Sequence, residues 1–452
     1  MPFMDDSCHT CDTHQEPSYE ATTSLRAHHD LDKSRTQTPE TRNLPSPPML
    51  TVCCYFQVHQ PFRLNQDFTF FEIGSGNCAY EDDAGNREIM RRVADRCYLP
   101  TNALMLELIE AFGGRFRIAY SISGVALDQF ELYAPEVLES FKGLMATGCV
   151  ELLSETYYHS LAFLFSPDEF RRQVAAHREK IEELFDYTPT TFRNTELIYN
   201  NDLAAEIERQ NFKAILTEGA TQILGWRTPN YVYQPSPTYR LKLLLKNFQL
   251  SDDLAFRFSE DSWDGYPLTA DKYAAWIHDI AGAGEVVNLF MDYETFGEHQ
   301  WAESGIFEFL RAFPGAVLAN EACCFMTPCE VAESHHPMAK IDVPHVISWA
   351  DIERDTTAWL GNDMQGAAVA DLYALEQKII DSGDAALIDT WGRLQTSDHF
   401  YYMCTKWYSD GDVHKYFNPY PSPHQAFITF ANVLNDIRLR LANGSTDLRE
   451  KK

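Results

Sequence analysis

Two motifs in this chain end a short apolar, strand-like run with carboxylates. Residues 192–200 (FRNTELIYN) carry Glu196, and residues 290–299 (FMDYETFGEH) carry Asp292 and Glu294. In a β/α barrel, catalytic side chains lie at the carboxyl ends of the strands. Two carboxylates that meet there are the minimum apparatus for breaking a glycosidic bond. We therefore take the carboxylates of these two motifs, Glu196 in the first and Asp292 or Glu294 in the second, as the candidate catalytic groups.

Polar side chains also follow two other strand-like runs. His59 comes directly after the first run, and Glu155 and His159 follow the third. A single such residue would be explained by ordinary packing. Several sets at the same end of one sheet are harder to explain in that way, because burying charges without a role is costly.

Two further segments combine aromatic rings with carboxylates. Residues 348–362 contain Trp349, and residues 397–403 contain Asp398 and His399. Aromatic rings stack on the apolar faces of sugars, while acids and amides bind sugar hydroxyls. The predicted substrate-binding residues are therefore His59, His159, Glu294, Trp349, Asp398 and His399.

A metal site is the main alternative for these side chains. His59, Glu155, His159, Asp292 and Glu294 could in principle form a site of nitrogen and oxygen ligands. The chain has no HExxH motif or paired-histidine spacing, and Cys8 and Cys11 lack a second ligand pair. We therefore predict neither a metal nor a cofactor.

Strand-like and helical patterns alternate along the chain. The predicted strands are 51–58, 115–121, 149–154, 190–195, 213–217, 247–250 and 286–292. The predicted helices between them are 101–113, 134–147, 168–186, 203–211 and 269–281. Continuous apolar runs suit strands that are buried on both faces of a parallel sheet. This alternation predicts an α/β fold, an incomplete parallel (β/α)7 barrel followed by a C-terminal helical region.

This pattern divides the chain into three predicted segments. Residues 1–47 are polar and aperiodic and predict a disordered leader. Residues 48–340 form the predicted catalytic barrel. Residues 341–445 form the predicted helical region, with helices at 363–381, 384–403 and 423–442, and complete the active-site cleft.

The composition narrows the class of protein. The formal net charge of −29 argues against nucleic acid as a partner. No run approaches the roughly 20 apolar residues that span a membrane, and the first residues do not resemble a signal peptide. The 11 cysteines form no regular disulfide framework, so we expect a reducing, cytoplasmic location. The sequence leaves the oligomeric state open.

The motifs together resemble glycoside hydrolase family 57. That family has five short signature regions, and matching segments occur here in the same order. They are residues 56–61, 148–159, 193–197, 292–297 and 397–403. The resemblance implies that Glu196 is the nucleophile and Asp292 the acid/base. It also implies an incomplete seven-stranded barrel and action on α-glucans with retention of configuration.

The motifs resemble most closely the α-amylases of the family. The resemblance thus implies an α-amylase-like enzyme acting on α-1,4-glucans. A 4-α-glucanotransferase or a branching enzyme would use the same residues with a sugar as acceptor. A metal-dependent carbohydrate deacetylase would require an Asp-Asp metal motif at the first strand, which is absent.

Overall fold

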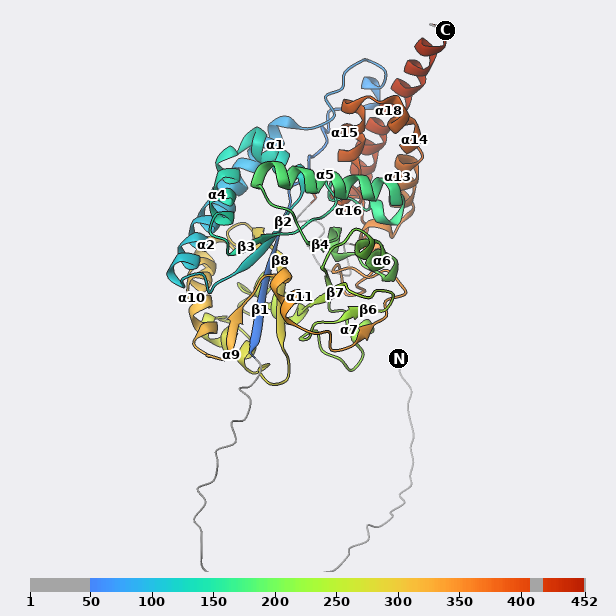
Figure 1. Ribbon diagram of the computed structural model, residues 1–452. Coiled ribbons are helices and arrows are strands. Elements are labelled where there is room, and N and C mark those ends of the chain that lie inside the picture. Colours follow the sequence, from blue (N-terminus) through green and yellow to red (C-terminus); the bar gives the residue numbers. More distant parts are fainter. Residues whose placement is uncertain (1–48, 407–417, 451–452) are drawn as a thin grey trace, which may run out of the picture. The chain divides into compact units, whose positions relative to one another are not determined.

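The computed structural model describes residues 49–406 and 418–450 (Figure 1). The predicted leader, residues 1–47, and the Cys8/Cys11 pair lie outside these ranges. Strand β1 (Leu50–Val58) occupies the middle of a parallel sheet with the order β3-β2-β1-β8. Its neighbours are β2 (Ile118–Ile122), β3 (Val150–Leu152) and β8 (Val286–Asp292), and β9 (Cys323–Phe325) pairs with the start of β1.

A second parallel sheet has the order β4-β5-β7. Its strands are β4 (Thr191–Arg193), β5 (Ala214–Glu218) and β7 (Lys242–Lys246). Two main-chain links join it to the first sheet. Ser154 forms a parallel bridge with Phe192. At the other edge, the N–H of Asn247 donates to the carbonyl oxygen of Asn288 over 2.9 Å. A minor pair joins β6 (Gln234–Pro235) and β10 (Lys340–Ile341).

Six of the seven predicted strands are present, with ends shifted by three residues at most. The strand predicted at 247–250 is wrong. Asn247 is instead the N-cap of helix α8 (Phe248–Ala255), and its side chain accepts a hydrogen bond from the N–H of Leu250. An Asn at this position satisfies an otherwise unpaired helix donor, which favours the helix. The strand that completes the second sheet is β7, directly before that cap.

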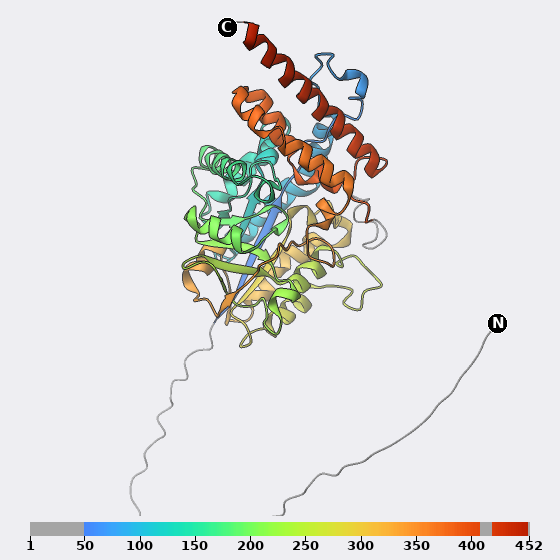
Figure 2. The same ribbon diagram turned by 90° about the vertical axis from the view of Figure 1, so that its right-hand side faces the viewer.

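Helices surround both sheets (Figure 1). Those within the α/β part are α1 (Asp83–Val93), α2 (Leu99–Ala111), α3 (Gly124–Tyr133), α4 (Pro135–Met145), α5 (Pro167–Phe185), α6 (Asn201–Arg209), α7 (Thr221–Leu224), α9 (Ala270–His278), α10 (Ile306–Leu318) and α11 (Pro328–Ser334). The later helices are α12 (Thr357–Leu360), α13 (Asp363–Tyr373), α14 (Glu376–Ser382), α15 (Ala385–Leu394), α16 (Ser397–Tyr401) and α18 (Pro423–Glu450). Helix α18 packs along α13 and α14 (Figure 2).

The strands are buried on both faces. In β1, Val52, Cys54 and Phe56 pack against the surrounding helices, whereas Cys53 and Tyr55 face an inner cluster. That inner cluster also contains side chains of β5 and β7 from the second sheet. The two sheets therefore share one interior, as expected for strands with continuous apolar runs.

Candidate active site

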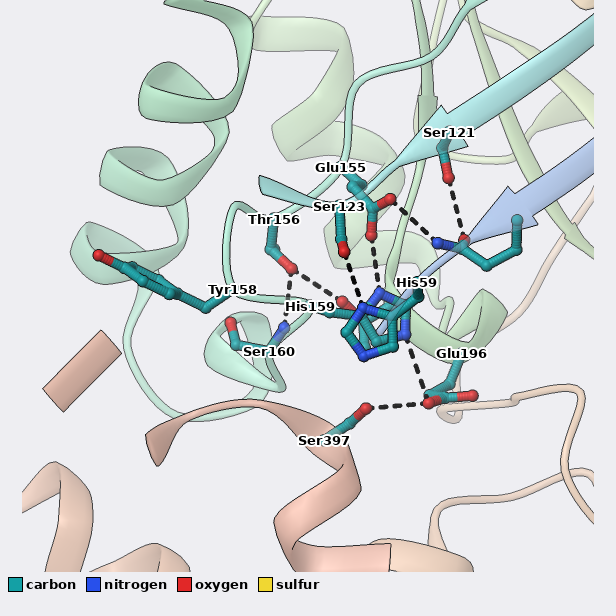
Figure 3. A network of polar contacts seen from close by, with 12 residues as sticks. His59, Ser121, Ser123, Glu155, Thr156, Tyr158, His159, Ser160, Glu196 and Ser397 are labelled. Carbon is teal, nitrogen blue, oxygen red and sulfur yellow. Dashed lines mark hydrogen bonds and ion pairs between the residues drawn. The ribbon is translucent and has the colours of Figure 1, made fainter. Parts of the chain in front are cut away.

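The predicted polar residues lie at the carboxyl ends of parallel strands. His59 follows β1, Glu155 and His159 follow β3, and Glu196 follows β4. Asp292 is the last residue of β8 and lies opposite Gln57 in the register of β1. Because the strands are parallel, these side chains lie at the same edge of the sheets. Figure 3 shows His59, Glu155, His159 and Glu196 close together there.

Three groups hold the carboxylate of Glu196. The hydroxyl of Ser397 donates to Oε1 over 2.9 Å, and the indole N–H of Trp349 donates to Oε2 over 2.8 Å. Nε2 of His159 forms an ion pair with Oε1 at 3.5 Å. Glu196 has a left-handed backbone, with φ of 57°, which is uncommon for a residue with a Cβ and typical of functional sites. The side chain stays 17% exposed, so a ligand can reach it.

His159 bridges two carboxylates. Its Nδ1 lies 2.7 Å from Oε2 of Glu155, on the side of the ring away from Glu196. Burial lowers the pKa of His159, but the bonds to Glu155 and Glu196 outweigh burial and raise it to about 9. Burial raises the pKa of Glu196, but the hydrogen bond and charge of His159 more than offset that effect and lower it. At neutral pH, His159 is therefore a cation and Glu196 an anion.

His59 stacks on His159, with ring centroids 3.9 Å apart and planes inclined by 20°. Nε2 of His59 lies 2.9 Å from Oδ2 of Asp398, and Nδ1 lies 2.7 Å from the hydroxyl of Ser123. Burial, followed by the charge of His159, lowers the pKa of His59. A neutral His59 ring avoids repulsion with the charged ring beneath it.

Asp292 differs from Glu196 in its surroundings. Its carboxylate accepts no hydrogen bond from any residue in the described ranges 49–406 and 418–450. Burial, and then the negative charge of Glu196, raise its pKa to about 6. The two candidate catalytic carboxylates thus have pKa values shifted in opposite directions. Such a separation is typical of an acid paired with a nucleophile.

Glu294 and His399, two of the predicted sugar-binding residues, lie in surroundings that differ from those of Glu196. Glu294 is buried and accepts a hydrogen bond from the hydroxyl of Tyr98, and burial raises its pKa to about 8. The buried ring of His399 packs against Tyr402 and Phe430, and burial lowers its pKa to about 4. Neither belongs to the hydrogen-bond network of Glu196, and their assignment as sugar ligands stays a prediction.

The structure gives roles to residues that were not among the predicted site residues. Gln57 donates to Oε1 of Glu155 over 3.1 Å and fixes that carboxylate from β1. Ser397 and Ser123 bind Glu196 and His59, respectively. Serines at these positions carry no local signal, because their partners are distant in sequence. The one sequence signal is for Ser397, which directly precedes Asp398 in a segment already selected for its acids and aromatic residues.

No group of three or more His, Cys, Asp or Glu side chains in ranges 49–406 and 418–450 is arranged to hold a metal ion. Nor does any helix in this part of the chain have the length and apolar character needed to cross a membrane.

Comparison with known proteins decides the family. The profile of glycosyl hydrolase family 57 matches residues 53–344, which include the candidate nucleophile and acid. The chain belongs to glycoside hydrolase family 57. This glycoside hydrolase is also 45% identical, over 395 residues, to a putative α-amylase of Methanocaldococcus jannaschii. The match covers 84% of this chain and 82% of the relative.

Solved structures of low sequence identity share the fold. The branching enzyme of Pyrococcus horikoshii superimposes with a TM-score of 0.60 at 14% identity, covering 82% of this family 57 chain and 87% of that one. The α-amylase AmyC of Thermotoga maritima superimposes with a TM-score of 0.57 at 14% identity, covering 88% and 94%. At this identity the likeness concerns the fold alone.

Proposed function

We propose that this protein is a retaining, α-amylase-like hydrolase of α-1,4-glucans, with Glu196 as nucleophile and Asp292 as acid/base. One observation carries the proposal. Glu196 is bonded by Trp349 and Ser397 and kept ionised by His159, and its charge adds to burial in raising the pKa of Asp292. The 45% identity to a putative α-amylase supports the choice of substrate.

The reaction then proceeds in two displacements. A carboxylate oxygen of Glu196 attacks the anomeric carbon, while Asp292 gives its proton to the departing glycosidic oxygen. This forms a glycosyl ester on Glu196 and releases the first sugar product. Asp292, now ionised, takes a proton from water, whose oxygen attacks the same carbon and releases Glu196. Two inversions leave the anomeric configuration unchanged.

We assign substrate contacts to side chains that border Glu196. His59 and Asp398 are 10% and 24% exposed and bonded to each other, so they present a paired donor and acceptor to sugar hydroxyls. Trp349 offers part of its ring to an apolar sugar face. His159 is 3% exposed, so its main role would be to hold Glu196 ionised.

The domain arrangement is part of the same proposal. The bridge at Ser154 and the Asn247–Asn288 hydrogen bond link the two sheets at both edges, which supports an interrupted (β/α)7 barrel over residues 48–340. Ser397 and Asp398, from the region 341–445, complete the cleft.

Product analysis tests the proposal against transfer. The protein is incubated with maltoheptaose and amylose, and the products are separated by chain length. Shorter reducing α-maltooligosaccharides, with the α-anomer seen first by NMR, are expected. Longer chains would instead show a glucanotransferase, and new α-1,6 linkages a branching enzyme. No change in either glucan would contradict the substrate assignment.

A further inference from the structure

Arg193, the last residue of β4, is buried, and no described residue accepts a hydrogen bond from its guanidinium group. Its exposed fraction is 0%, and Nε, Nη1 and Nη2 have no acceptor among residues 49–406 and 418–450. A guanidinium group carries five N–H donors and stays charged in proteins. Burying such a cation without acceptors is costly, so its presence calls for a functional explanation.

The guanidinium lies against the ring that binds the nucleophile. Its central carbon is 5.0 Å from the centroid of the Trp349 ring, a separation at which cation–π attraction offsets part of the burial cost. The indole N–H of Trp349 in turn donates to Glu196. Lys246 also approaches the Trp349 ring, at 5.5 Å, but its ammonium group has an acceptor of its own in Asp252, at 2.7 Å.

Charged groups from several strands surround this position. Those that face Arg193, Glu196 or Asp292 are Tyr55, Glu155, His159, Lys246 and Asp398. Burial and the charge of Glu196 raise the pKa of Asp292, and the charge of Arg193 opposes them. The charge of Arg193 likewise helps to lower the pKa of Glu196. Arg193 is hydrogen-bonded to neither acid, and its charge lowers the pKa of both.

Resting on the proposed function, we propose that Arg193 is a positioning residue whose buried, unpaired charge sets the pH range over which Glu196 is ionised while Asp292 is protonated. A side chain with no exposed surface does not bind the sugar. No carboxylate of Glu155, Glu196 or Asp292 accepts a hydrogen bond from Arg193. The oxygens of Glu155 and Glu196 are bonded to other donors. The charge is thereby kept at full strength in an interior of low dielectric constant.

The test compares pH profiles of kcat/KM on a maltooligosaccharide. The variants are Arg193→Met, Arg193→Lys and the control Arg117→Met, which removes a partly buried arginine at the amino end of β2. Removing the charge raises the pKa of both acids, so both limbs of the Arg193→Met profile move to higher pH, by about one unit. Arg193→Lys keeps the charge and the wild-type profile, and Arg117→Met leaves the profile in place.

Thermal unfolding supplies the second measurement. Methionine fills a similar length of space without an unpaired charge, so Arg193→Met is expected to melt no lower than the wild type. An Arg193→Met variant that is active with an unmoved profile, or that fails to fold, would show a structural role and overturn the inference. An Arg193→Lys profile displaced like that of Arg193→Met would do the same. A wild type without glucan activity would refute the proposed function, and this inference with it, whereas the variant outcomes refute only the inference.

Discussion

Trp349 holds both the side chain and the main chain of Glu196. Its indole N–H donates to Oε2 over 2.8 Å, and its backbone N–H donates to the Glu196 carbonyl oxygen over 3.2 Å. Two residues earlier, Ile347 pairs with Tyr199 in an antiparallel bridge. The loop that carries Trp349 therefore follows the chain around the proposed nucleophile and stabilises its left-handed backbone.

Replacing Trp349 with phenylalanine keeps a ring and removes the indole donor. A hydrogen bond to a charged group contributes about 1.5–3 kcal/mol, so kcat should fall by about 10- to 150-fold. KM should change less, since the ring remains. Steady-state kinetics on maltoheptaose provides the measurement. Trp276→Phe is the matched control, because Trp276 is also partly buried but packs in α9, against Lys272. Equal losses in both variants would contradict a role for the indole N–H.

Variants of the two proposed catalytic acids should differ in the substrates on which they lose activity. Glu196→Gln is expected to lose nearly all activity on every substrate, because no glycosyl ester can form. Asp292→Asn should be crippled on maltooligosaccharides but much less impaired in the first step with an α-glucosyl fluoride, whose leaving group needs little acid. General acid assistance is typically about 10²- to 10⁴-fold, which sets the size of this difference.

Mass spectrometry of Asp292→Asn with the fluoride completes this test. A glycosyl adduct is expected on the peptide that contains Glu196. An adduct on Asp292 or Glu294 in the wild type would mean that the roles are misassigned. Asp292→Asn should melt close to the wild type, since it conserves shape and breaks no hydrogen bond, and Glu196→Gln should remain folded.

The charge of His159 should make stability depend on pH. Its folded-state pKa of about 9 lies above the usual value of 6.5, so its contribution is complete below pH 6.5 and is lost progressively as pH rises to about 9. A shift of this size corresponds to about 3 kcal/mol. Urea unfolding between pH 6 and 9.5 should show this decline in the wild type and a smaller one in His159→Gln. Parallel curves for the two proteins would exclude a charged His159.

Gly297 should be essential for the turn that follows Asp292. Its φ is +110°, and a Cβ there would lie 2.0 Å from the carbonyl oxygen of Arg96. Gly297→Ala should therefore lower the free energy of unfolding by on the order of 2–4 kcal/mol. Gly366→Ala, within helix α13 and with nothing near its Cβ, should be neutral or stabilising. Denaturant titration of both variants tests the difference, and an unaffected Gly297→Ala would show that the turn adapts.

Much of the fold and part of the site could be predicted from local patterns. Continuous apolar runs marked most strands of the parallel sheets, because a strand buried on both faces needs apolar side chains in both directions. The polar residues that follow β1, β3, β4 and β8 then had to share one edge, since parallel strands present their carboxyl ends together. Periodicity also marked the later helices, but two of the predicted helices each proved to be a pair. The segment 363–381 forms α13 and α14, and 384–403 forms α15 and α16.

Tertiary contacts decided what the motifs could not. The partners Trp349 and Ser397 of Glu196, and Asp398 of His59, come from segments far along the chain. Their meeting depends on how the helical region packs on the strands, which no local pattern encodes. Within one motif, the carboxylate of Asp292 has no hydrogen-bond donor in the described part of the chain, while Glu294 accepts from Tyr98. The isolation of the Arg193 charge also became visible only in three dimensions, because it requires knowing which acceptors other residues already occupy.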